Sequence, residues 1–295
     1  MKSAPVAKEH MREASTTLRL PTSAAGLLRL AALASLAFIS AAGLSLAKDR
    51  CADTAEAVQA LHDDDRYQAT SLLFAAARLG CEPQARALLD RGAAIDAKDR
   101  EGKTALAKAA EADKLPLIKL LLERGANVNA RAVNGSTPLF FAAEQDRGAV
   151  VALLLERGAD PNLPGRKGVR PLAAAAFNGS TESVAELSKF GADPNALDDD
   201  GSGAIVYAAG HGYASVVALL LQAGVDVNRR YAHGLTALMW AAGHDASTGV
   251  DDVDSTIKTL IEHGAAQDLK DDRGKTAADI AHDLGHERAA KLLER

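Results

Sequence analysis

Short apolar runs alternate with polar, glycine-containing stretches along most of the chain. Leu120-Leu121-Leu122 precedes Gly125, and apolar residues stand before a glycine in the same way at regular intervals. The glycines of this series are Gly92, Gly125, Gly158, Gly191, Gly224 and Gly264, with steps of 33, 33, 33, 33 and 40 residues. A second series, from Gly102 to Gly274, keeps the same steps. A fixed period near 33 residues predicts a solenoid of stacked units.

The residues inside one unit carry a specific resemblance. Residues 137–143 read T-P-L-F-F-A-A, and residues 153–162 read L-L-L-E-R-G-A-D-P-N. These stretches resemble the T-P-L-H-x-A-A opening and the L-L-L-x-x-G-A-D-x-N close of the ankyrin repeat. The resemblance covers about residues 68–295 and implies an all-α ankyrin-repeat solenoid of about seven helix-turn-helix repeats with short hairpin fingers. The implied repeats are 68–100, 101–133, 134–166, 167–199, 200–232, 233–272 and 273–295.

Each element of the pattern has a physical reason. The hydroxyl of Thr137 can cap the free N–H groups at a helix start, and Pro138 suits the first helical turn. The small Ala142-Ala143 pair lets neighbouring helices approach closely. Gly158 ends the second helix in a left-handed turn. Equivalent threonines occur in other repeats: Thr104, Thr236 and Thr276.

Two features depart from the repeat. Arg170 and Gly203 stand where other repeats have the capping threonine, so weaker helix starts are expected there. Seven extra residues within 244–255 account for the 40-residue step. This acidic segment is expected to be a solvated loop, because its carboxylate spacing fits no standard calcium-binding loop.

Phe140 and Phe141 are adjacent, and neighbours on a helix point about 100° apart. The resemblance implies that Phe140 points into the interface between repeats and Phe141 onto the outward, concave-facing side. The residues expected on that side are Phe141, Phe177, Tyr207, His211, Trp240 and His244. Aromatic side chains dominate binding energies at protein interfaces, so these residues are candidates for binding a partner. The alternative is that the rings fill gaps between repeats.

The predicted fingertips carry alternating charge. Arg166 and Lys167 occupy one finger, and Asp199 and Asp200 occupy the next. Ion pairing between solvated fingers explains this pattern and contributes little to stability. The other interpretation is an electrostatic guide for a partner protein, which makes these four residues further binding candidates.

Composition narrows the function. The chain is 47% hydrophobic but only 4% aromatic, which suits short, closely packed helices. Its net charge is −5 and no stretch is strongly basic, which argues against nucleic acid as a partner. No catalytic motif, cofactor site or metal site is predicted. His282 and His286 are spaced i, i+4, but no third ligand is evident.

The N-terminus predicts export. Five basic residues precede an uncharged run from Leu30 to Ala47, which ends with the small residues Ser45 and Ala47. Residues 1–47 are therefore interpreted as a secretory signal peptide, with Met11 an alternative start. The other interpretation is a membrane anchor with the repeats facing the periplasm. After cleavage, the chain would have a net charge of −8, and no membrane association is expected.

Cys51 and Cys81 are the only cysteines. In an exported chain, two cysteines are more often bridged than free, whereas two buried thiols are the alternative. Residues 48–67 are predicted to form an N-terminal capping helix over the first repeat, held by this bridge. The ends of a repeat array need such covers, because a single repeat cannot bury its own apolar face.

The chain resembles exported, periplasmic ankyrin-repeat proteins of bacteria. That group includes immunity proteins that neutralise toxins and partners of a periplasmic catalase. The resemblance implies a monomeric binding protein that is not an enzyme. Its concave face and fingertips would bind a partner protein, as an inhibitor or immunity protein that occludes a toxin or enzyme. The alternative is a supporting or scaffolding protein for a periplasmic enzyme such as catalase.

Overall fold

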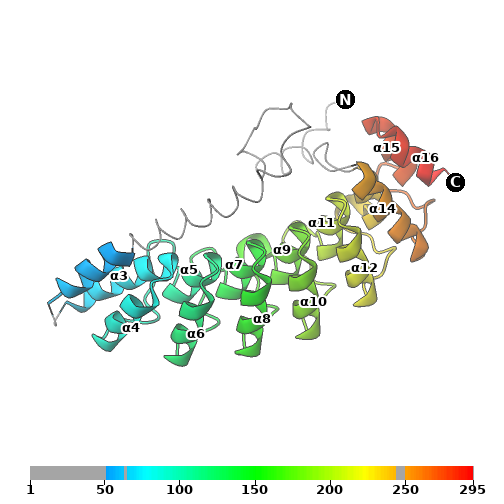
Figure 1. Ribbon diagram of the computed structural model, residues 1–295. Coiled ribbons are helices and arrows are strands. Elements are labelled where there is room, and N and C mark those ends of the chain that lie inside the picture. The colour runs from blue at the N-terminus through cyan, green and yellow to red at the C-terminus, as the bar shows by residue number, and fades with distance from the viewer. Residues whose placement is uncertain (1–50, 63–64, 244–249, 295) are drawn as a thin grey trace, which may run out of the picture. The chain divides into compact units, whose positions relative to one another are not determined.

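The computed structural model describes residues 51–62, 65–243 and 250–294, which form successive helix pairs (Figure 1). Residues 51–59 are helical, and two short 3-10 turns, η1 (Arg166–Gly168) and η2 (Ala232–Gly234), lie at fingertips. The remaining helices are α3 (Arg66–Leu79), α4 (Glu82–Asp90), α5 (Ala105–Glu111), α6 (Leu115–Glu123), α7 (Pro138–Glu144), α8 (Gly148–Glu156), α9 (Pro171–Phe177), α10 (Thr181–Lys189), α11 (Ala204–Gly210), α12 (Ala214–Gln222), α13 (Ala237–Ala242), α14 (Val250–Glu262), α15 (Ala277–Leu284) and α16 (Glu287–Leu293).

The helices form two layers. Each odd-numbered helix from α3 to α15 packs against the next odd-numbered one, and the even-numbered helices form the second layer beside them. We call the odd-numbered helices the inner helices and the even-numbered helices the outer helices. The predicted all-α array of two-helix repeats is confirmed.

Alanine pairs bring the inner helices together. Ala142 and Ala143 of α7 are fully buried, and so are the equivalent alanines of α5, α9, α11 and α13. Leucines such as Leu154 of α8 fill the space between the layers and are also fully buried. Burying one such leucine side chain stabilises the fold by about 1.5–3 kcal/mol, so these contacts between helices contribute strongly to stability.

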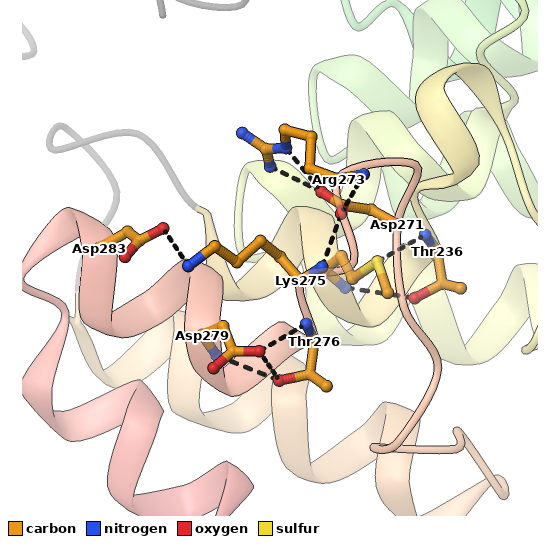
Figure 2. Close-up of polar contacts among 8 residues, drawn as sticks. Thr236, Asp271, Arg273, Lys275, Thr276, Asp279 and Asp283 are labelled. Carbon is orange, nitrogen blue, oxygen red and sulfur yellow. Dashed lines mark hydrogen bonds and ion pairs between the residues drawn. The ribbon is translucent and has the colours of Figure 1, made fainter. Parts of the chain in front are cut away.

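The predicted helix starts and ends are confirmed. The Thr137 hydroxyl accepts a hydrogen bond from the Phe140 N–H at 3.2 Å. At α15, Thr276 and Asp279 form a capping box, in which the Asp279 carboxylate accepts the Thr276 N–H at 2.9 Å (Figure 2). The six glycines after the outer helices have φ between 82° and 95°, a left-handed conformation that glycine adopts at little cost.

The two repeats without a capping threonine use other contacts. Neither Arg170 nor Gly203 provides a side-chain cap, as expected. The Arg170 guanidinium instead donates to the carbonyl oxygens of Asn162 and Leu197, both at 3.1 Å, and so joins two neighbouring fingers. At Gly203, an added Cβ would lie 2.9 Å from the Tyr231 ring, which already occupies the space of a capping side chain.

Hydrogen bonds across the repeat boundaries fix the fingers. Asn129 accepts the Asp160 N–H at 2.9 Å and donates to the Gly158 carbonyl at 3.4 Å. Asn162 and Asn228 make equivalent bonds to the repeats that follow them. Fingers also pair through the backbone, with bonds from Val133 to Glu101, from Asp199 to Lys167 and from Asp272 to His233. The asparagine of the repeat signature is therefore a connector between units.

The prediction of a solvated loop at residues 244–255 is wrong in part. Residues 250–255 belong to helix α14, while residues 244–249, including His244, lie outside the described residues. Asp254 is only 5% exposed, and its carboxylate forms an ion pair with Arg288 of α16 at 2.6 Å. Half of the acidic insertion is thus a helical extension that packs on the last repeat.

The prediction that the Phe141 side chain points outward to the concave side is also wrong. Its side chain is 3% exposed, and its ring meets the Phe140 ring edge-on with centroids 6.3 Å apart. The Lys103 ammonium, from the preceding finger, lies 4.6 Å from the Phe141 ring centroid. Glu101 and Glu111 hold this ammonium at 3.0 and 2.9 Å. A neighbouring repeat therefore covers the ring.

The N-terminal helical segment is tied to the first repeat. Cys51 and Cys81 form the predicted disulfide, 30 residues apart in sequence. Arg91 donates to the carbonyl oxygen of Val58 at 2.5 Å, and the Val58 side chain is buried. The predicted signal peptide, residues 1–47, lies outside the described residues.

We expect replacement of Cys51 and Cys81 by serine to lower the free energy of unfolding by about 3–4 kcal/mol, because the disulfide restricts the unfolded chain. Chemical denaturation of the purified protein measures this difference. Dithiothreitol should destabilise the parent protein and leave the serine variant unchanged. An equal response of both proteins to dithiothreitol would contradict the prediction.

We expect Phe141→Ala to lower the free energy of unfolding by about 3–5 kcal/mol, as truncation of a buried aromatic ring does. Phe177 is 36% exposed and packs against two neighbouring rings, so Phe177→Ala should cost less, about 1–2 kcal/mol. Urea denaturation of both variants tests this contrast. Similar losses for the two variants would mean that Phe141 is not a core residue.

Candidate functional site

Five aromatic and imidazole rings gather along the inner helices α9, α11 and α13 and the turn after α11. We call this group the aromatic surface; it consists of Phe177, Tyr207, His211, Tyr213 and Trp240. Phe177 ends α9, Tyr207 lies in α11, and Trp240 lies in α13. Because these helices pack side by side, residues 63 positions apart contribute to one surface. The structure therefore brings together Phe177, Tyr207, His211 and Trp240 from the residues that the sequence predicted.

Phe177 is at the centre of the ring contacts. Its ring meets the Tyr207 ring edge-on at 5.9 Å between centroids and the His211 ring at 4.6 Å. The His211 ring stacks on Tyr213 with centroids 5.9 Å apart and an interplanar angle of 12°. His211 Nδ1 also lies 2.9 Å from the Tyr207 carbonyl oxygen, which fixes the imidazole orientation. The rings thus support one another while Phe177 stays 36% exposed.

Trp240 extends the aromatic surface toward the C-terminus. Its indole ring packs over Gly210 of α11, where an added Cβ would lie 3.6 Å from the ring. The side chain is half-buried, and its Nε1 is buried without a hydrogen-bond partner in residues 51–62, 65–243 and 250–294. That distance is an ordinary van der Waals contact, so the tryptophan ring lies against α11 at Gly210.

Carboxylates border the aromatic surface. The Tyr207 hydroxyl donates to the Asp198 carboxylate at the base of a finger. Burial raises the pKa of Tyr207, and the negative charges of Asp198 and Asp200 raise it further. Burial also raises the pKa of Tyr213, with a contribution from Asp252 at the start of α14. Both phenols are therefore neutral at physiological pH and sit in a negative potential.

In the earlier repeats, lysine side chains of the chain itself cover the aromatic rings. There the chain's own lysines lie over the inner-helix rings, with Lys103 on Phe141 and Lys108 at 6.0 Å from the centroid of Phe74. Lys108 is held by Asp99 at 2.5 Å. The inner helices of the first repeats thus present lysine–carboxylate pairs, whereas those of the later repeats present rings beside carboxylates.

The charged fingertip candidates are exposed but are not paired with one another. Arg166 forms an ion pair with Glu144 at 2.5 Å. Lys167, Asp199 and Asp200 are exposed, and these two fingers are joined by the backbone bond from Asp199 to Lys167 at 3.0 Å and by the Arg170 bond to Leu197. Over the described part of the chain, no ion pair joins Arg166 or Lys167 to Asp199 or Asp200. The predicted ion pairing between these fingers is therefore wrong.

The histidines near the C-terminus have structural roles. His282 Nε2 lies 2.7 Å from Glu294, and His286 Nδ1 lies 2.9 Å from the Ala242 carbonyl oxygen. The described residues contain no group of three or more potential metal ligands. Within the same residues, no helix has the length and apolar character that crossing a bilayer requires.

Sequence reasoning missed Tyr213 and Asp252. Tyr213 lies in the turn between α11 and α12, outside the inner-helix positions from which the candidates were drawn. Its place two residues after His211 was the available signal. Asp252 was assigned to a solvated loop, and only the helical start of α14 brings its charge near Tyr213.

Comparison with known protein families agrees with this architecture. The model for ankyrin repeats (3 copies) matches residues 72–165 and 172–251, which is more than half of the chain. No curated protein matches the chain. Ankyrin repeats imply a protein–protein interaction module and a scaffold that is typically non-catalytic. The chain is a member of the ankyrin repeat family.

Proposed function

We propose that this chain is an exported protein that binds a partner protein through the aromatic surface and the adjoining fingertips. It acts there as an inhibitor or immunity protein that covers the active site of a toxin or another enzyme. The observation that carries this proposal is the exposed ring of Phe177, which packs against the rings of Tyr207 and His211. Ordered aromatic rings lose little entropy on binding and contribute strongly to interface energies.

Because Phe141 is buried, it is removed from the set of proposed binding residues. The binding residues now lie between α9 and the turn after α11, with Trp240 of α13 at one border. Arg166 and Lys167 lie on one finger and Asp199 and Asp200 on the next, and the charge of Asp200 acts on Tyr207 of this area. The docking area therefore covers the fourth to sixth repeats and leaves the first two repeats outside the contact.

Export is supported by the cysteines and by the N-terminal sequence. The disulfide between Cys51 and Cys81 uses both cysteines of the chain. Disulfides persist in oxidising compartments such as the periplasm. The basic start and apolar run of residues 1–47 fit a secretory signal peptide.

We expect Phe177→Ala to weaken partner capture at least tenfold, because an exposed anchor ring at an interface contributes more than about 1.4 kcal/mol. The purified protein would be immobilised and exposed to envelope extract and to secreted proteins of competing bacteria. Captured proteins would be identified and their affinity measured by calorimetry. Phe190→Ala is the matched control, since Phe190 is also 36% exposed but follows the outer helix α10. An equal affinity of the Phe177→Ala variant would contradict the proposed site.

The activity of the captured partner distinguishes inhibition from support. An inhibitor or immunity protein abolishes the activity of a bound enzyme at stoichiometric concentration. A supporting protein for an envelope enzyme such as catalase leaves that activity intact or raises it. The second result would replace the inhibitor proposal while keeping the docking site.

A further inference from the structure

We propose that the partner segment that docks on the aromatic surface is basic, with arginine or lysine side chains that lie against its rings and beside Asp200 and Asp252. This inference rests on the proposed function, because it specifies the chemistry of the same site. It commits to a cationic polypeptide segment of the partner protein.

The first repeats show the arrangement inside the chain itself. Lys103 lies over the Phe141 ring at 4.6 Å from its centroid, between the carboxylates of Glu101 and Glu111. Burial disfavours the ammonium, but the bonds to the two glutamates outweigh this effect and raise the pKa of Lys103. An ammonium between a ring face and two carboxylates is thus a stable arrangement on the inner helices.

The later repeats keep the rings and lose the cation. At the repeat period of 33 residues, Tyr207 and Trp240 stand in register with Phe141 by two and three periods. The residues that stand to them as Lys103 stands to Phe141, 38 positions earlier, are Val169 and Ser202. The repeat therefore supplies no equivalent lysine for Tyr207 or Trp240, while Asp200 stands to Trp240 as Glu101 stands to Phe141, 40 positions earlier.

The position of Phe177 also differs from the equivalent positions of the earlier repeats. The positions that correspond to Phe177 in the two preceding repeats are Glu111 and Glu144, which form ion pairs with Lys103 and Arg166. In the fourth repeat this internal ion pair is replaced by an exposed ring. Where the two preceding repeats have a glutamate in an internal ion pair, the fourth repeat therefore has a ring that another molecule can contact.

Charge along the array changes sign at this point. Residues 66–176 contain 17 Lys and Arg against 12 Asp and Glu, a net charge of +5, whereas residues 177–262 contain 4 against 12, a net charge of −8. Two of the four cations have partners within the chain. Arg229 donates to Asn195 at 3.0 Å, and Lys189 pairs with Glu186 at 3.3 Å. Arg170, at the adjoining finger, donates to Leu197. A basic segment is therefore complementary to this half of the array.

Peptide binding to the purified protein tests the inference. The probe is a twelve-residue peptide of four Arg-Gly-Ser units, and the comparison peptides carry glutamate or citrulline in place of arginine. Trp240, the only tryptophan of the chain, reports binding by its fluorescence. The arginine peptide should bind, the citrulline peptide should bind at least fivefold more weakly, and the glutamate peptide should not bind. Added salt should weaken the binding of the arginine peptide.

Charge variants separate a local site from the field of the whole array. Asp200→Asn with Asp252→Asn should weaken arginine-peptide binding at least fivefold. Glu182→Gln with Glu262→Gln removes two exposed charges from the outer helices of the same acidic half and should change binding less than twofold. Equal losses for the two double variants, or an equal affinity for the citrulline peptide, would overturn the inference.

The natural partner separates this inference from the proposed function. If capture requires Phe177 but tolerates Asp200→Asn with Asp252→Asn, the docking site stands and the basic segment is wrong. If capture does not require Phe177, the proposed function itself fails.

Discussion

Packing of one repeat on the next is the constraint on which the structure depends. A helix pair of this size has an apolar face on each side, and it buries those faces only against neighbouring pairs. The fully buried alanines of the inner helices set how closely the pairs approach, and the leucines of the outer helices fill the second layer. Every other feature of the array, including the fingers, follows at the spacing that this packing imposes.

The same constraint leaves one surface free to vary. The fully buried alanine pairs recur in every inner helix from α5 to α13. Other positions of the same inner helices change from repeat to repeat. The position of Phe177 is a glutamate in two earlier repeats, and the position of Tyr207 and Trp240 is Lys108 in the second repeat. The framework is thus held by a few small and apolar residues, and the chemistry of the surface is set by substitutions that do not disturb it.

Sequence reasoning predicted the framework because its signals are local to one repeat. The hydroxyl of Thr137, the pair Ala142-Ala143 and the left-handed Gly158 act within their own helix or turn, and all three behave as expected. The prediction for Phe141 failed because the residue that covers it, Lys103, comes from another repeat. The register of one repeat does not show which side chains of its neighbour reach across it.

The prediction of a solvated loop at the acidic insertion failed for a related reason. Asp251, Asp252 and Asp254 looked like a solvated loop, but packing against α12 and α16 makes a helix of this segment and pairs Asp254 with Arg288. Long-range contacts, which are not visible in local composition, decided the structure there. Four of the six proposed aromatic and histidine site residues still came together, because α9, α11 and α13 pack side by side.

Hydrogen exchange measured by mass spectrometry tests the dependence on stacking most directly. Ala175→Leu adds volume at a fully buried position of α9, and Ala223→Leu makes the same change at an exposed position after α12. If stacking holds the array together, Ala175→Leu will lower the protection of α7, α9 and α11 together, and Ala223→Leu will leave protection unchanged. A loss of protection confined to α9, with α7 and α11 as protected as in the parent protein, would contradict the account.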